Sequence, residues 1–225
     1  MIFIKEDYFL YFNSKEKHRS AFPVNDRNES RKMETQLNKD FWNNRYVNNQ
    51  TGWDLGEVSP PLKAYVDQLE NKSISILIPG AGNAHELAYL LEKGFTNVTI
   101  IDIAPKLIQR LKEKYGLTNA TILEGDFFQH QGAYDLILEQ TFFCAIHPSQ
   151  RKDYVQKMHD LLSVNGKLCG VLFNRDFDGG PPFGGSITEY EKLFPTFFDE
   201  VSLEICYNSH EARAKNEAWV ALTKK

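Results

Sequence analysis

The sequence predicts an α/β fold, in which a seven-stranded, mostly parallel sheet carries helices on both faces and ends in an antiparallel hairpin. Two observations predict it. Apolar runs typical of strands alternate with helical patterns over residues 38–194. The last two apolar runs, 201–207 and 218–223, are separated only by the polar segment 208–217. That segment is too short for a crossover helix of ordinary length, so we expect the two runs to pair antiparallel.

The first half of the chain shows clear helix boundaries. The second helix opens with Ser59 and then Pro60 and Pro61, a cap residue followed by prolines in the first turn. The third and fourth helices each end at a glycine, Gly94 and Gly116. In order, the expected elements are helix 38–46, helix 60–71, strand 74–78, helix 84–93, strand 98–102, helix 104–115 and strand 121–124.

The second half begins with a strand that ends in polar residues and continues with an amphipathic helix. That helix places Val155, Met158, Leu161 and Leu162 on one face, at i, i+3, i+6 and i+7. In order, the expected elements are strand 134–139, helix 150–162, strand 167–173, the short helix 187–194 and the two strands of the hairpin.

Length and composition indicate one domain with a substantial core, because the chain has 225 residues of ordinary globular composition. The net charge is −4 and no basic face is evident, so we expect no nucleic-acid partner. No apolar run reaches the about 20 residues that a membrane span needs. Cys144, Cys169 and Cys206 are few and far apart, which favours a reducing, cytoplasmic location and no metal site. We expect a monomer or weak homodimer.

The N-terminal 32 residues differ from the rest. Residues 13–32 are almost entirely polar, which predicts a flexible extension at 1–32 before a single domain at 33–225. The alternative is a short N-terminal strand or helix that packs on the domain, since residues 1–12 are rich in aromatic side chains.

The turn Gly80-Ala81-Gly82 indicates a nucleotide site. It follows the first strand and precedes a helix, and the next strand ends in Asp102, which can accept hydrogen bonds from two ribose hydroxyls. His85 stands where a dinucleotide site has its third glycine, which favours a ligand with a ribose and no pyrophosphate, such as S-adenosylmethionine. NAD would use the same acid, and Asp102 could instead cap the following helix.

Four further segments combine polar and aromatic residues. Asp126 and Phe127 follow the third strand; they either bind an adenine, or Asp126 belongs to a turn and Phe127 to the core. Cys144 has no base nearby in the sequence, so we expect an inert buried thiol. Trp42, Tyr46 and Trp53 form either a core stripe or an aromatic lid at 38–58 that would attract a cationic sulfonium. The loop with Arg175 and Phe183 is either a connector or part of the substrate pocket.

These motifs together resemble the thiopurine S-methyltransferase family, over residues 38–225, and most closely its halide/thiol methyltransferase ("harmless to ozone layer") branch. The resemblance implies a class I methyltransferase Rossmann-like fold and methyl transfer from S-adenosylmethionine to a small soft acceptor: a thiol, hydrosulfide, thiocyanate or halide. Tyr46 and Gln140 replace a tryptophan and an arginine of the thiopurine enzymes, which favours the halide/thiol branch. The motifs are FW-x3-Y-x6-W-D-x-G, P-G-A-G, D-I-A, G-D-F-F, EQTFFCAI-x-P-x2-R and G-G-P-P-F.

Site residues follow from the motifs and from this resemblance. Because a sulfonium is an activated methyl donor, we name no general base. An NAD(P)-dependent Rossmann enzyme and a non-catalytic nucleotide-binding protein of the same fold remain as alternatives. The residues expected at the acceptor pocket are Tyr46, Phe142, Phe143, Arg175 and Phe183. The residues expected to bind the cofactor are Trp42, Trp53, Gly80, Ala81, Gly82, Asp102, Ile103, Asp126, Phe127, Glu139 and Gln140.

Overall fold

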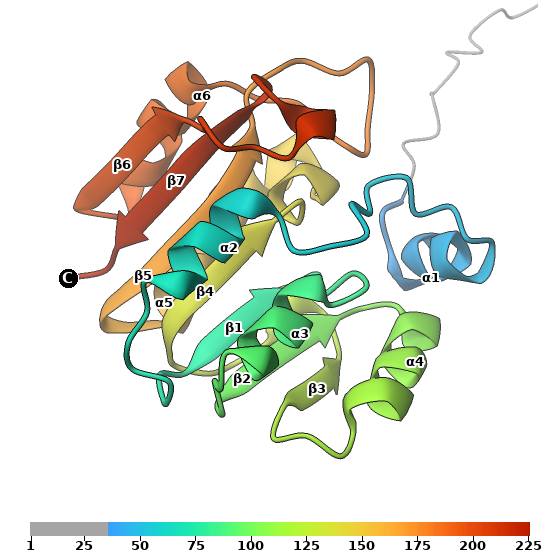
Figure 1. The fold of residues 1–225 in the computed structure, drawn as a ribbon. Helices are drawn as coiled ribbons and strands as arrows, with labels where there is room; N and C mark the ends of the chain where they lie inside the picture. The colour runs from blue at the N-terminus through green and yellow to red at the C-terminus, as the bar shows by residue number, and fades with distance from the viewer. Residues whose placement is uncertain (1–35) are drawn as a thin grey trace, which may run out of the picture. The chain divides into compact units, whose positions relative to one another are not determined.

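The computed structural model describes residues 36–225, so the expectation for residues 1–32 lies outside the described residues. They form one seven-stranded sheet in the order β3-β2-β1-β4-β5-β7-β6 (Figure 1). The pairs among β1 to β5 are parallel, and β7 is antiparallel to both β5 and β6, as the sequence predicts. The strands are β1 (Ile76–Pro79), β2 (Val98–Asp102), β3 (Thr121–Glu124), β4 (Tyr134–Gln140), β5 (Leu162–Phe173), β6 (Glu200–Ile205) and β7 (Glu217–Thr223).

Helices cover both faces of the sheet, and each face has its own apolar core. Alternate residues of β1 enter different cores: Ile76 and Ile78 pack with α2, α3 and α4, whereas Leu77 packs with α5 and α6. In Figure 1, α2 and α3 lie in front of the sheet and α5 behind it. The helices are α1 (Lys39–Val47), α2 (Pro60–Asp67), α3 (His85–Glu92), α4 (Pro105–Tyr115), α5 (Arg151–Leu161) and α6 (Ile187–Leu193).

Several element boundaries differ from the sequence prediction, most of them by one or two residues. Helix α2 ends at Asp67 rather than at residue 71: Gln68 N and Leu69 N donate to carbonyl oxygens three residues back, which closes the last turn. Strand β5 begins at Leu162, where that residue pairs with Tyr134, although the segment after it is polar. Strand β6 ends at Ile205 instead of residue 207.

The carboxyl ends of β1, β2 and β4 meet at one edge of the sheet. Strands β2 and β4 flank β1 on opposite sides. The chain adds β2 and β3 on one side of β1 and β4 and later strands on the other, so β1 and β4 form a topological switch point. Ligands of open α/β sheets bind at such a point. Gly80, Asp102 and Gln140 stand at these three strand ends. Among the described helices, none is long and apolar enough to cross a membrane.

Candidate active site

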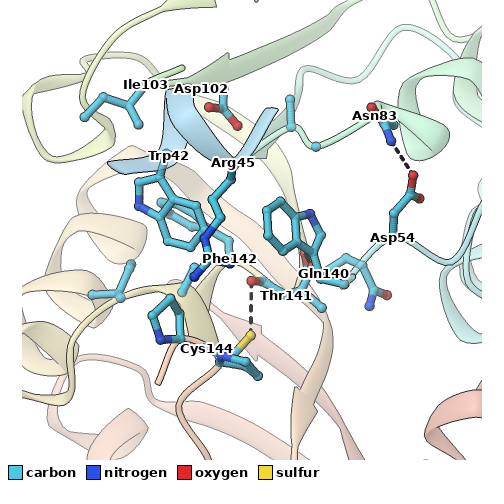
Figure 2. A pocket seen from close by; sticks show the side chains of 18 of the residues that line it. Trp42, Arg45, Asp54, Asn83, Asp102, Ile103, Gln140, Thr141, Phe142 and Cys144 are labelled. Carbon is cyan, nitrogen blue, oxygen red and sulfur yellow. Dashed lines mark hydrogen bonds between the residues drawn. The ribbon is translucent and has the colours of Figure 1, made fainter. Parts of the chain in front are cut away.

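A cavity of about 790 Å³ lies at this edge of the sheet, a volume typical of sites for small molecules and cofactors. Its walls come from the segment before β1, the ends of β1, β2 and β4, and the loops after β5 and β6. In Figure 2, Asp102 and Ile103 lie at one end, Thr141 and Cys144 at the other, and Trp42 between them. The predicted residues that line it are Trp42, Tyr46, Trp53, Gly80, Ala81, Gly82, Asp102, Ile103, Asp126, Phe127, Gln140, Phe142 and Arg175.

The two glycines of the turn have different roles. Both have positive φ, +63° at Gly80 and +52° at Gly82, which favours glycine. A Cβ on Gly80 would lie 2.4 Å from the Phe142 ring, so close packing also requires glycine there. A Cβ on Gly82 would meet only the Gly80 carbonyl oxygen, at 4.0 Å. The open space above Gly82 belongs to the cavity, where a ligand can approach the backbone.

Asp102 places a buried carboxylate in the cavity wall. Burial raises the pKa of Asp102 to about 6, against the opposing effect of hydrogen bonds from the backbone N–H groups of Ala104, Gly82 and Ile103. The distance from Ala104 N to Asp102 Oδ1 is 2.9 Å. The N-cap residue of α4 is Ala104 rather than Asp102. The carboxylate therefore has fixed orientation and retains acceptor capacity toward a ligand.

Trp42, Tyr46 and Trp53 form a cluster of edge-to-face rings in the cavity wall. The Trp53 ring centroid lies 5.8 Å from that of Trp42 and 5.8 Å from that of Tyr46. Tyr46 is buried, and burial followed by the charge of Asp102 holds the pKa of its hydroxyl well above the usual range. The cluster thus belongs to the apolar core and also lines the cavity, while the lid interpretation stays a prediction.

Asp54 joins this aromatic segment to the glycine turn, a link that sequence reasoning missed. Its Oδ1 lies 2.7 Å from His85 Nε2 and accepts a hydrogen bond from Gly56 N at 2.9 Å, and its Oδ2 accepts from Asn83 (Figure 2). Burial raises the pKa of Asp54, but the hydrogen bonds from Gly56, Asn83 and His85 outweigh it and the net shift is downward. The sequence signal that could have revealed this link was His85, which stands where a dinucleotide site has its third glycine.

Gln140 and Asp126 offer polar atoms to a ligand from two strand ends. Gln140 Oε1 accepts a hydrogen bond from Ser59 Oγ at 2.6 Å, whereas its buried Nε2 has no partner within residues 36–225. Such a buried donor fits a ligand that supplies an acceptor. Asp126 Oδ1 caps a short turn by accepting from Phe128 N, and Phe127 packs against Phe142 with ring centroids 5.0 Å apart. Gln140, Asp126 and Phe127 all line the cavity.

The opposite end of the cavity is mainly apolar. Thr141 there has φ +62°, a strained conformation for a β-branched residue, and such strain is typical of functional sites. Cys144 Sγ donates to the Thr141 carbonyl oxygen at 3.2 Å, and burial raises the pKa of this thiol to about 12. Cys144 therefore stays protonated, in line with an inert thiol. Phe142, Phe173, Phe177, Pro181 and Pro182 complete this wall.

Three predicted site residues, Glu139, Phe143 and Phe183, lie behind this wall instead of lining it. Glu139 Oε1 accepts from Phe142 N at 2.8 Å and from Phe143 N at 3.0 Å, and Oε2 accepts from the Tyr154 hydroxyl. Phe143 belongs to the core on the α5 side. Phe183 N donates to the Cys144 carbonyl oxygen at 2.7 Å. The hydrogen bonds of Glu139 and Phe183 to the backbone at residues 142–144 hold the strained turn in place. Both carboxylate oxygens of Glu139 are engaged in these and the Tyr154 contact.

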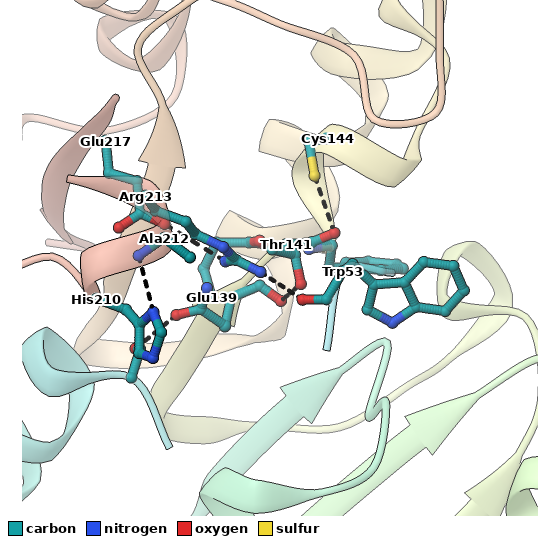
Figure 3. Close-up of polar contacts among 11 residues, drawn as sticks. Trp53, Glu139, Thr141, Cys144, His210, Ala212, Arg213 and Glu217 are labelled. Atoms are coloured by element: carbon teal, nitrogen blue, oxygen red, sulfur yellow. Dashed lines mark hydrogen bonds and ion pairs between the residues drawn. The ribbon is translucent and has the colours of Figure 1, made fainter. Parts of the chain in front are cut away.

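Arg213, in the segment between β6 and β7, also lines the cavity. Its Nη2 donates to the Trp53 carbonyl oxygen at 2.5 Å, and its Nη1 lies 3.4 Å from Glu217 Oε1 (Figure 3). The side chain is buried, so it ties the aromatic segment to the C-terminal hairpin across the cavity. Nothing in the surrounding polar sequence singled it out. Within residues 36–225, no group of three His, Cys, Asp or Glu gathers as a metal site.

Comparisons with known proteins agree with this geometry. A family model described as Thiopurine S-methyltransferase matches residues 37–224. Probable thiol methyltransferase 2 of Arabidopsis thaliana is 33% identical over 170 residues, which cover 72% of this chain and 75% of that protein. Thiocyanate methyltransferase 1 of Brassica oleracea is 30% identical over 171 residues, with coverage of 72% and 75%. The Burkholderia thailandensis 1,6-didemethyltoxoflavin-N1-methyltransferase, solved with bound S-adenosylhomocysteine, shares the fold: TM-score 0.64, 17% identity, coverage of 83% and 87%.

Proposed function

The chain belongs to the thiopurine S-methyltransferase family, and from this premise we propose that it methylates a small soft nucleophile with S-adenosylmethionine as donor. The acceptor classes proposed are thiols, hydrosulfide and thiocyanate, with halides as a further class. S-adenosylmethionine supplies a methyl group already activated on a sulfonium. The protein therefore has to orient the acceptor and exclude water, and positioning alone can provide much of the rate.

The described residues fit this cofactor. We propose that Asp102 accepts hydrogen bonds from the ribose hydroxyls and that the open backbone at Gly82 faces the methionine part. Gln140 Nε2, which is buried and without a partner within residues 36–225, would donate to the methionine end. Asp126 and Phe127 would hold the adenine, and Trp42 would cover the sulfonium, which aromatic faces attract.

The observation that carries the proposed acceptor class is the composition of the opposite wall. Phe142, Phe173 and Phe177 contribute apolar surface, and Cys144 stays a neutral thiol. The cationic side chains of Arg175 and Arg213 also line the cavity. An apolar wall suits soft, weakly hydrated anions and thiols. Sequence similarity to a thiol methyltransferase and a thiocyanate methyltransferase supports the same class. Three buried free cysteines are consistent with the cytoplasmic location we propose.

An NAD(P)-dependent enzyme is a poorer fit. Helix α3 begins at His85, whose ring is held by Asp54, where a pyrophosphate site has glycine. Family membership likewise sets aside the alternative of a non-catalytic nucleotide-binding protein.

An acceptor panel tests the proposal. The full chain is incubated with methyl-labelled S-adenosylmethionine and, in turn, with iodide, bromide, thiocyanate, hydrosulfide, a small organic thiol and a thiopurine. We expect transfer to the small acceptors and faster turnover of hydrosulfide or thiocyanate than of the thiopurine. Asp102→Ala serves as the cofactor-site control. A faster reaction with the thiopurine would overturn the proposed acceptor class, and transfer to none of them would overturn the proposed function.

A further inference from the structure

Glu217, at the start of β7, is a buried carboxylate with an unused oxygen. The side chain is 2% exposed. Its Oε1 lies 3.4 Å from Arg213 Nη1, but its buried Oε2 has no hydrogen-bond partner within residues 36–225. The Ser209 hydroxyl lies near enough to this carboxylate to lower its pKa, but it makes no hydrogen bond of good geometry within residues 36–225. Buried polar atoms are rarely left without partners, so this oxygen calls for a functional explanation.

A second, much smaller void adjoins Glu217. Its volume is about 10 Å³, close to the space that one water needs. Thr141, Cys144 and Phe173 line this void and the large cavity alike. These shared residues place the small void beside the end of the cavity where we place the acceptor.

The charged and titratable groups around the void favour Glu217 as its proton acceptor. Glu139 also lines the void, but both of its oxygens already accept hydrogen bonds. Cys144 is a neutral thiol. Burial raises the pKa of Glu217, opposed by Ser209, Arg213 and His210. A carboxylate whose pKa is raised by burial is a better match to a thiol proton than an exposed one.

We propose that Glu217 Oε2 receives, through a water in the small void, the proton of a thiol acceptor, or that of neutral hydrogen sulfide as it becomes hydrosulfide. This inference rests on the proposed function. The S–H bond breaks and its electron pair stays on the acceptor sulfur, while the proton moves to the water as the water's own proton moves to Oε2. The resulting sulfur anion would then use that pair to form its bond to the methyl carbon of the donor. The bond between that carbon and the sulfonium sulfur would break, and its electron pair would leave with the sulfur of S-adenosylhomocysteine. The proton returns to solvent after the product leaves, which restores the carboxylate.

The first test compares two acceptors in one variant. Thiocyanate has no proton to lose, whereas a small thiol of high pKa does. We expect Glu217→Gln to lower kcat/KM for the thiol at least about tenfold more than for thiocyanate, with the difference shrinking as pH approaches the thiol's own pKa. Glu204→Gln is the matched control, because Glu204 is an exposed carboxylate on the neighbouring strand β6.

The second test observes the proton directly, without turnover. The ultraviolet absorbance of thiolate is followed as the thiol binds to the complex with S-adenosylhomocysteine. We expect thiolate in the wild type below the free thiol's pKa, and less of it in Glu217→Gln. If the positive field of Arg213 alone ionised the thiol, removing the negative partner of Arg213 would increase the thiolate instead.

These outcomes separate the inference from the proposed function. Equal losses for thiol and thiocyanate, or more thiolate in Glu217→Gln, would overturn the role of Glu217 while leaving methyl transfer intact. Absence of transfer to any acceptor in the wild type would overturn the proposed function itself. Circular dichroism shows whether Glu217→Gln is folded; if it is not, Glu217→Asp keeps the charge beside Arg213 and is expected to show a smaller loss of the same kind.

Discussion

Asp102 combines two demands that conflict. A buried carboxylate is costly when charged, yet a ribose needs the charged form as hydrogen-bond acceptor. Neighbouring backbone N–H groups offset part of this cost, and a ligand's hydroxyls would offset more. The raised pKa of Asp102, about 6, therefore predicts that cofactor binding depends on pH.

We expect affinity for S-adenosylhomocysteine to be highest above pH 6 and to fall as pH decreases through about 6, because protonation of Asp102 removes an acceptor. Asp102→Asn should bind more weakly at neutral pH, by up to roughly 1.5–3 kcal/mol for each charge-assisted hydrogen bond lost. Its affinity should not follow this pH dependence. Calorimetric titration across the range measures both; an unchanged affinity in the folded variant would show that Asp102 does not bind the ribose.

The two turn glycines provide a matched pair of substitutions. Alanine at either position bears a similar strain from positive φ, of order 1–2 kcal/mol. Gly80→Ala also drives a Cβ into the Phe142 ring, so we expect it to melt at a lower temperature than Gly82→Ala. Gly82→Ala should instead lose cofactor affinity, because its Cβ occupies the open space of the cavity. Thermal melts of both variants with and without S-adenosylhomocysteine measure stability and binding. A lower melting temperature for Gly82→Ala than for Gly80→Ala would contradict the roles given to the two glycines.

Among elements, the segment 38–58 makes several polar contacts with distant parts of the chain. Asp54 binds His85 and Asn83, Asn43 Oδ1 accepts from Lys106 N at 2.8 Å, and the Trp53 carbonyl accepts from Arg213. Helix α1 packs beside α4 (Figure 1). We propose that this segment, held by these contacts, is a lid that opens when cofactor and product exchange.

Limited proteolysis with chymotrypsin tests the lid. We expect cleavage at the aromatic residues of 38–58 to slow when S-adenosylhomocysteine is added. Asp54→Asn should accelerate cleavage in the free protein, because it removes the charged partner of His85. Asp40→Asn, on the exposed side of α1, is the control and should change the rate little. Equal cleavage with and without ligand would argue against a lid.

The sequence predicted those elements and site residues that rest on local signals. The Gly80–Gly82 turn, Asp102 at a strand end and the terminal hairpin all follow from spacing and apolar pattern. Arg213 and Asp54 were missed because their partners lie far along the chain, at Trp53 and His85. Glu139 was misplaced because alternation along β4 does not show that its carboxylate turns inward to cap the backbone of the next turn.

In the whole molecule, residues 36–225 contain a complete seven-stranded sheet, two apolar cores and the full cavity. We therefore predict that a chain starting at Met33 folds and binds S-adenosylhomocysteine as the full chain does. Thermal melting and calorimetric titration of both chains measure this. A marked fall in melting temperature would show that residues 1–32 contribute to the stability of the domain.

The position of β7 has a consequence for synthesis. The last strand of the chain lies inside the sheet, between β5 and β6, and the Lys224 ammonium is bound by the carbonyls of His159 and Leu162. Strand β7 follows both of its partners in the chain, so β5 and β6 present open edges during synthesis until β7 has been made and pairs with them. A chain interrupted before β7 would keep these edges unpaired and prone to aggregation.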